Sequence, residues 1–317
     1  MVLLRKSIPQ NHDLKTAAEL GVGRHISVSN QHTDIAMTCL PEFMSWENLA
    51  AFSNSAFTTS LVGALAGAYA GAYAAQKIAE RSKERAEFQA QIRNTNTAIT
   101  LSFMVCNAAI SLKKQQTKGL CDTYFKKKAE LEAFSQKRKA GEISPDIPFE
   151  FQADLRSVPF PAVPIDALRS LVYEKLSVSD RPLALVATLA GVLSSLAGTI
   201  ANRNGLIASF KQLSPQAHDV ALPALYFGRP YGEGHVSTEY LDTMTGLQNL
   251  TDDVIFFSHL LCEDLATHGN TVLGKFKSQF KGILDQINAI ELPEKTAGLM
   301  PPDEQYLEWL SGFRERK

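Results

Sequence analysis

The clearest pattern in the chain is a run of 28 uncharged residues, 49–76, with basic residues directly after it. Its inner part, residues 56–75, is 20 residues long, which is about the length that an α-helix needs to cross a bilayer core. The basic flank, which begins with Lys77 and Arg81, is typical of the cytosolic side of a span. Because eight Ala and three Gly make the segment only weakly apolar, the alternative is an Ala-rich helix inside a soluble bundle. We predict a transmembrane helix over residues 49–76.

Three glycines within this run fall at strict four-residue spacing: Gly63, Gly67 and Gly71. On a helix they share one side, where small residues let another helix approach backbone to backbone. The row predicts a helix-packing face. The alternative is that the spacing is incidental, since Gly and Ala are common in membrane spans.

The next segment, residues 77–140, is predicted to be helical and strongly basic. Residues 77–139 hold 14 Lys and Arg against 6 Asp and Glu. The polar residues 94–97 interrupt the pattern, and Asn and Thr favour helix starts, so we expect a new helix there. A later seam has the coiled-coil-like spacing of four and three, and consists of Leu120, Tyr124, Lys127, Leu131 and Phe134.

Lys126, Lys127 and Lys128 form the densest basic run. Such a run could contact anionic lipid or a partner protein. Nucleic acid is disfavoured as a partner, because few aromatic side chains are interleaved with the lysines. The plain alternative is a solvated helix face that pairs with the acidic C-terminal part, where residues 203–317 hold 10 Lys and Arg against 15 Asp and Glu.

A second uncharged run, residues 182–202, is also long enough to span a membrane. Its large residues, however, follow a heptad-like stripe, and small or polar residues fill most of the other side. We therefore expect a helix buried in a bundle rather than a second span. The stripe consists of Val186, Leu189, Leu193, Leu196, Ile200 and Ile207, with Arg203 in the remaining position.

Proline and glycine mark the remaining boundaries. Five prolines within residues 141–164 predict a linker or an extended crossing segment. The C-terminal helical domain, residues 165–317, is predicted to contain a loop at 214–237 and a helix from about 240 to 290 that is broken near Gly269. Residues 1–48 form a separate N-terminal segment in which short alternation suggests a hairpin. Its first apolar residues are too few for a signal-peptide core.

Composition and candidate chemistry add few functional constraints. The 32 Lys and Arg nearly balance the 33 Asp and Glu, and four cysteines without paired spacing predict reduced thiols. On residues 252–268, His259 and Glu263 lie four apart, as two metal ligands on one helix face would. A third ligand is missing from the pattern, so we expect a solvated helix face, with no metal and no cofactor.

These patterns predict a mostly or wholly α-helical, single-pass membrane protein whose bulk faces the cytosol. The leading functional hypothesis is a non-enzymatic, membrane-anchored protein that binds a protein partner or assembles with itself. The alternatives are a membrane-permeabilising effector and a metal-dependent enzyme that uses the region of His259 and Glu263. The sequence does not indicate a small-molecule ligand.

Overall fold

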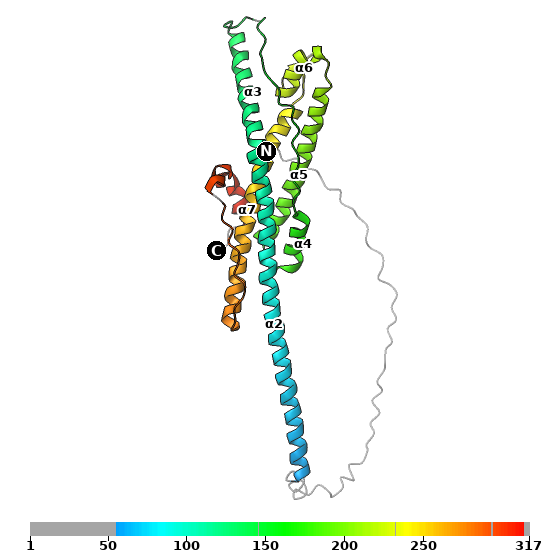
Figure 1. Cartoon of the computed structure of the whole chain (residues 1–317), viewed down its shortest axis with the longest axis vertical. Coiled ribbons are helices and arrows are strands. Elements are labelled where there is room, and N and C mark those ends of the chain that lie inside the picture. The colour runs from blue at the N-terminus through cyan, green and yellow to red at the C-terminus, as the bar shows by residue number, and fades with distance from the viewer. Residues whose placement is uncertain (1–54, 145, 232, 293, 314–317) are drawn as a thin grey trace, which may run out of the picture. The chain divides into compact units, whose positions relative to one another are not determined.

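The computed structural model describes residues 55–313, apart from residues 145, 232 and 293. The described part is mostly helical, which confirms the predicted α-helical character of the fold (Figure 1). The chain divides into two compact units, Met1–Gly71 and Ala72–Lys317. The predicted hairpin and Cys39 lie outside the described residues.

The described elements follow one another from α2 to α8. The helices are α2 (Ala56–Leu112), α3 (Lys118–Lys139), α4 (Ile165–Lys175), α5 (Arg181–Lys211), α6 (Pro215–Phe227), α7 (Glu239–Gln279) and α8 (Leu307–Ser311). A π-helical turn, η1 (Lys113–Thr117), joins α2 to α3, and the 3-10 turns η2 (Glu294–Leu299) and η3 (Asp303–Tyr306) precede α8. The strands β1 (Pro230–Tyr231) and β2 (His235–Val236) form one small antiparallel hairpin.

The new helix start expected at residues 94–97 is wrong, because α2 runs through this segment without a break. The threonines do not cap a helix. Thr95 Oγ1 donates to the carbonyl oxygen of Gln91, at 2.8 Å, so the side chain is satisfied inside the helix. Asn96 instead binds another part of the chain: its Nδ2 donates to the Gln286 carbonyl at 3.0 Å, and its Oδ1 accepts from the backbone N–H of Asn288.

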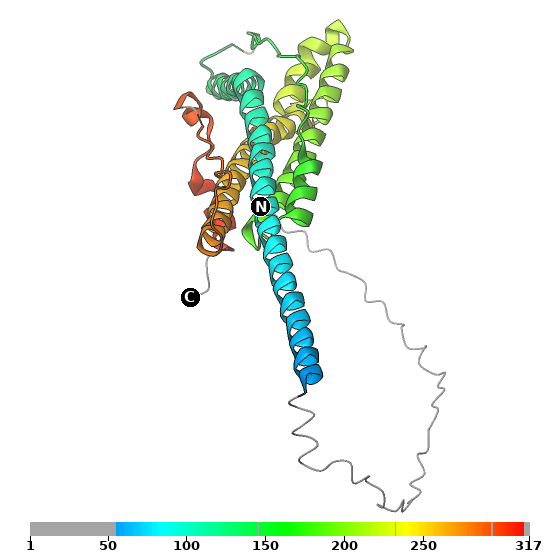
Figure 2. The same cartoon turned by 60° about the horizontal axis from the view of Figure 1, so that its bottom comes forward.

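The main core lies where α5 and α7 pack together, beside α2 and α3 (Figures 1 and 2). The predicted stripe of α5 is confirmed as a buried face, and all six of its apolar residues are almost fully buried. Three of the coiled-coil-like seam residues, Leu120, Tyr124 and Leu131, also lie in this core. Burial of such stripes is the main driving force for packing helices in a bundle.

Small side chains bring α2 close to α7. Ser102 Oγ donates to the carbonyl oxygen of Ser258, at 2.8 Å, and the thiol of Cys262 lies 3.7 Å from the carbonyl oxygen of Ile99. Both contacts join a side chain on one helix to the backbone of the other. They satisfy polar groups that would otherwise be costly to bury.

Arg203, which occupies the one charged position of the α5 stripe, is fully buried. Its guanidinium donates to the carbonyl oxygens of Arg156 and Asp154, at 2.8 and 3.4 Å, and to the Tyr240 hydroxyl, at 3.1 Å. Asn204 adds a two-way amide contact with the backbone of Val158. These hydrogen bonds hold the extended part of residues 141–164 against α5. The backbone polar groups of a proline-rich segment are thereby satisfied without a helix.

The loop expected at residues 214–237 is wrong over its first half, which forms α6. The helix includes Pro223, and its last residues, Tyr226 and Phe227, pack against Tyr124 and Tyr240 from α3 and α7. Aromatic packing of this kind adds to the stabilisation from area burial, against the local cost of the proline. The hairpin of β1 and β2 occupies the remaining part.

The predicted helix of residues 240–290 forms, but without a break near Gly269 and with an end at Gln279. Gly269 is buried, and a Cβ added to it would lie 2.6 Å from Ile287 Cδ1 and 2.9 Å from Thr95 Cγ2. The glycine therefore serves packing rather than helix termination. It lets the extended chain after α7 pass between α7 and α2.

The C-terminal aromatic residues fold back onto α7. The Tyr306 ring stacks on Phe256 with centroids 3.7 Å apart, and Trp309 packs edge-on to Phe257 at 5.0 Å. Asp303 begins the 3-10 turn η3, and the cap position before it is Pro302. The segment thus belongs to the same core as α7.

Candidate functional site

About the first six turns of α2 carry an uncharged apolar surface that is exposed. Side chains of residues 56–76 are exposed or half-buried throughout, with Phe57 at 69%, Leu65 at 63% and Tyr69 at 76% of full exposure. The large side chains recur every four residues and so form a ridge that winds around the helix by about 40° at each step. This apolar ridge consists of Phe57, Leu61, Leu65, Tyr69 and Tyr73.

The predicted glycine row lies on the other side of the same helix. Gly63 follows Leu61 by two residues, which is a rotation of about 200° at 3.6 residues per turn. A Cβ added to Gly63, Gly67 or Gly71 would have no described atom within 4 Å. The residues that the structure describes therefore leave the row open, and it stays a prediction as a helix-packing face.

Two helical stretches, Ala56–Lys139 and Arg181–Lys211, are long and apolar enough to cross a membrane. Length and composition are weak evidence by themselves, because buried core helices of soluble proteins have the same properties. The most apolar 18 residues of Ala56–Lys139 are 50% buried and so lie outside residues 56–76, where no side chain is buried. In α5 the apolar stripe is in the core, whereas the apolar ridge at the start of α2 is exposed.

The lysines at positions 126–128 lie on α3. Lys127 pairs with Glu130 at 2.7 Å and Lys128 with Glu132 at 2.6 Å, while Lys126 is exposed. Both pairs join residues of one helix, and pairs of this kind stabilise it only slightly. Their predicted contact with lipid or a partner stays a prediction.

The acidic residues near the middle of α7 are mostly engaged in structural contacts rather than solvated as expected. Asp252 pairs with Lys113 at 2.5 Å, and both side chains are largely buried. Asp264 receives a two-pronged ion pair from Arg181, with Nε to Oδ2 at 2.8 Å. Asp253 accepts a hydrogen bond from the Tyr306 hydroxyl at 2.9 Å, and burial raises the pKa of this carboxyl.

His259 and Glu263 lie on a partly exposed side of α7. Their side chains are half-buried and exposed, and His259 Nδ1 lies 3.9 Å from Glu263 Oε1. Among the described residues there is no group of three or more side chains that could hold a metal ion. The geometry adds no third ligand to the pair.

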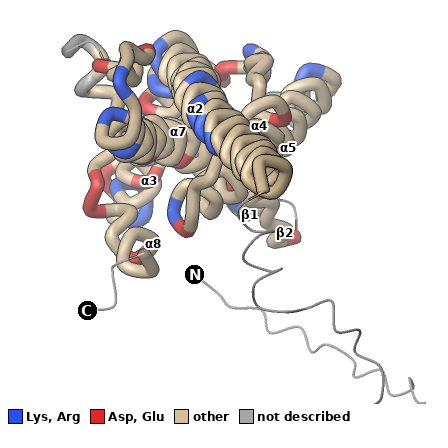
Figure 3. The backbone as a smooth tube through the Cα atoms, turned by 90° about the horizontal axis from the view of Figure 1, so that it is seen from below, with Lys and Arg blue, Asp and Glu red and all other residues tan. Residues whose placement is uncertain are grey.

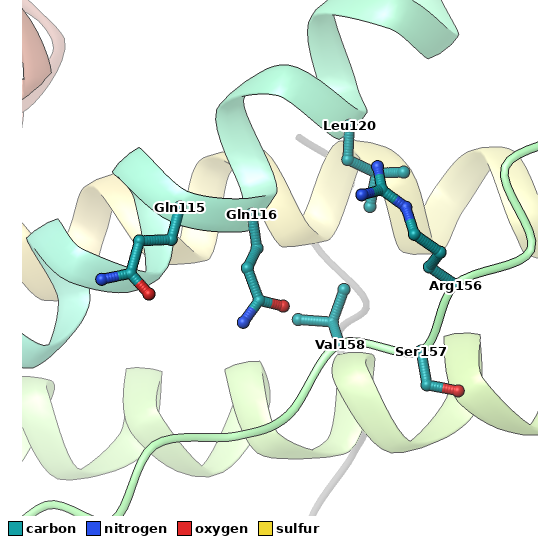
Figure 4. A pocket seen from close by; sticks show the side chains of 6 residues that line it. All are labelled: Gln115, Gln116, Leu120, Arg156, Ser157 and Val158. Carbon is teal, nitrogen blue, oxygen red and sulfur yellow. The ribbon is translucent and has the colours of Figure 1, made fainter.

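A small cavity of about 100 Å³ lies beside the π-helical turn, which the sequence patterns did not predict (Figure 4). Gln115 and Gln116 line it from η1, and Arg156, Ser157 and Val158 line it from the crossing segment. The Arg156 guanidinium is paired with Asp154 at 2.6 Å. Amide and guanidinium groups can donate hydrogen bonds to water or to a small anion, and the volume suits only a few such molecules.

The part of the chain that the structure describes contains three buried thiols. Cys106, Cys121 and Cys262 are free, as the cysteine spacing predicted. Burial raises the pKa of Cys121 and of Cys262 to about 12. Since the thiolate is the nucleophilic form, these cysteines are chemically inert at neutral pH.

Comparison with known proteins adds no further assignment. No family model matches the chain, and no curated protein or solved structure is detectably similar to it.

Proposed function

We propose that the protein is a non-enzymatic, membrane-anchored helical protein that acts through partner binding or self-assembly. Residues 56–76 are the membrane anchor, and the helical bundle that follows lies on the cytosolic side. Figure 3 supports this orientation, because the tan near end of the α2 tube is followed by blue segments, which mark Lys and Arg positions. Basic residues after a span favour the cytosolic side.

The exposure of the apolar ridge carries the proposal. Contiguous exposed apolar patches on soluble proteins rarely exceed a few hundred Å². Five large side chains along one helix would each add area that costs about 25 cal/mol per Å² in water. A bilayer, whose core is about 30 Å thick, covers such a helix over about 20 residues.

We assign α5 to the cytosolic bundle rather than to a second span. Its outward positions include Ala187, Gly191 and Ser195, which are exposed. A lipid-facing surface favours large apolar side chains instead. With α5 in the bundle, the acidic C-terminal part stays on the same side as the basic α3.

Within this topology, Lys126–Lys128 are better placed for a protein partner than for lipid. The helix from Gln76 to Leu112 alone advances about 54 Å at 1.5 Å per residue. The lysines follow on α3, far outside a headgroup layer that is about 6 Å thick. We therefore propose them as a partner-contact surface.

Alkaline carbonate extraction tests the anchor. The full chain is expected to stay in the membrane pellet, and a chain without residues 49–76 is expected to be released. A chain without residues 1–48 is the matched control and stays in the pellet. Release of the full chain would contradict the proposal and favour a soluble helical binding protein.

Cross-linking in membranes tests self-assembly separately. The triple substitution Gly63→Ile, Gly67→Ile and Gly71→Ile is expected to abolish a cross-linked oligomer, because branched side chains keep the backbones apart. The matched control places isoleucine at Ala64, Ala68 and Ala72, on another side of the helix. If both variants cross-link like the natural chain, the glycine row is not the assembly face.

A further inference from the structure

The C-terminal end of α7 and the turn after it, residues 275–283, are held against α2 close to the end of its apolar segment. Arg81 Nη2 donates to the carbonyl oxygen of Gln279 at 3.4 Å, and its guanidinium lies 5.9 Å from the centre of the Phe280 ring. Phe88 from α2 contacts both Phe280 and Phe276, with ring centroids 6.0 and 6.1 Å apart. Figures 1 and 2 both show the orange end of α7 beside α2.

The chain reverses direction at Gly282, and this position requires glycine. Its φ of +145° lies in a region that side chains rarely adopt, and an added Cβ would be 3.1 Å from Arg85 Nη2. The next residue, Ile283, is 98% exposed. The turn therefore presents an isoleucine to solvent at its tip, immediately after a fixed reversal of the chain.

Basic residues lie both in this turn and in the stretch of α2 that contacts it through Arg81 and Arg85. Lys275, Lys277 and Lys281 are exposed, and none forms a salt bridge with any described residue. The cations are Lys77, Arg81, Lys83, Arg85, Lys275, Lys277 and Lys281, and the anions within the same segments are Glu80, Glu84, Glu87 and Asp285. Of these anions, Glu80 pairs with Lys77 and Glu87 lies 3.9 Å from Lys83. The surface is net positive.

We propose that the turn of residues 275–283 is a second membrane contact, which binds anionic phospholipid headgroups through its lysines and inserts Ile283 into the interface. This inference rests on the proposed anchor. The turn contacts Arg81, which follows Gln76 by about 7.5 Å along the helix, so it lies just beyond the headgroup layer and within reach of it for extended lysine side chains. An anionic surface attracts each nearby lysine and so favours the docked turn about fivefold per residue.

Hydrogen exchange of the full chain in lipid nanodiscs tests this contact. One nanodisc contains phosphatidylcholine alone, and the other also contains phosphatidylserine. We expect backbone amides of residues 279–284 to exchange at least about fivefold more slowly in the anionic discs. Equal exchange in the two discs, with the protein incorporated in both, would overturn the inference and leave the anchor intact.

Charge reversal supplies the matched variants. Lys277→Glu with Lys281→Glu is expected to remove the lipid-dependent protection, while Lys137→Glu with Lys139→Glu keeps it. The control pair makes the same charge change on exposed residues at the end of α3, at the opposite end of the bundle (Figure 1). A second variant, Ile283→Asp, leaves the lysines in place and is also expected to lose the protection. Failure of the natural chain to enter either disc would overturn both the anchor and this contact.

Discussion

The apolar segment of α2 and the apolar segment of α5 have similar lengths and both lack charge, yet they differ in what they bury. In α5, large side chains such as Leu189 and Leu193 form one stripe that packs into the core. In α2, the ridge of large side chains, exemplified by Leu65 and Tyr69, is exposed. Mean hydropathy alone would favour α5 as the span, since it reaches 2.0 there against 1.3 in the stretch that contains α2. The placement of the large residues, and what covers them, points the other way.

The comparison teaches that a helix is suited to its surroundings face by face. The outer side of α5 carries small and polar residues that water solvates well. The segment of α2 has small residues on one side and a large apolar ridge on the other, so no side of it favours water. Substitutions in one of the two segments, with matched substitutions in the other as controls, test this difference.

The largest effect is expected from charges placed in the α2 segment. Leu61→Arg with Leu65→Arg should release the protein from membranes on carbonate extraction, because each arginine near the centre of a span costs about 2.5–3.5 kcal/mol. The matched control is Ser194→Arg with Ser195→Arg on the exposed side of α5, which should stay in the pellet. Release of the control chain instead would mean that α5 contacts lipid.

Truncation of the buried stripe is expected to have the next largest effect, on bundle stability. Leu189→Ala should lower the free energy of unfolding by about 2–5 kcal/mol, since it leaves a cavity in the core. Leu65→Ala removes the same atoms from an exposed position and should change bundle stability by less than about 0.5 kcal/mol. Thermal unfolding in detergent micelles, followed by circular dichroism, measures both. Equal losses in the two variants would contradict the assignment of the stripe to the core.

Two glycines provide a third, smaller contrast. Gly269→Ala should destabilise the bundle by about 1–3 kcal/mol, because the new Cβ overlaps Ile287 and Thr95. Gly67→Ala meets open space and should be neutral or should stabilise its helix by up to about 1 kcal/mol. The same unfolding measurement applies. The double variant Gly269→Ala with Ile287→Ala should recover part of the loss, and no recovery would point away from steric overlap.

The smallest effect is expected from pH. Burial, with a lesser contribution from Lys275, lowers the pKa of His268 below its usual 6.5. As the pH falls, the unfolded chain therefore binds this proton before the folded chain does, so stability is complete above about pH 6.5 and declines below it. Unfolding measured from pH 7.5 to 5 should show this decline, and His268→Gln should reduce it. His259→Gln, on the same helix, is the control, and an equal reduction there would assign the effect elsewhere.

Much of the helical architecture could be predicted from residue spacing. The stripe of α5 follows a heptad-like period, so its six apolar residues could be predicted from the sequence, whereas Leu185 lies off the stripe and is buried as well. What could not be predicted is how a buried arginine is satisfied, because its acceptors are backbone carbonyls 47 and 49 residues away in the sequence. The acidic residues of α7 show the same limit, since their partners Lys113 and Arg181 come from other elements.

The errors arose where local signals competed with tertiary contacts. Gly269 reads as a helix break but serves a close approach of three chain segments. Residues 94–97 read as a cap, but Asn96 binds a segment almost 200 residues away. Residues 215–227 were expected to form a loop but form α6, which is stabilised by aromatic rings from α3 and α7. In the candidate site, the glycine row followed from spacing, while the basic turn after α7 depends on contacts that spacing does not encode.

The burial of three thiols gives the protein a practical property as a reagent. Cys106, Cys121 and Cys262 are buried in the folded bundle. Thiol-reactive dyes and spin labels should therefore not react with them. A cysteine introduced on the outside, for example at Ile283, would then report its own surroundings over a low background from the bundle. By the same reasoning, an unlabelled Cys262 says nothing about which side of the membrane it occupies.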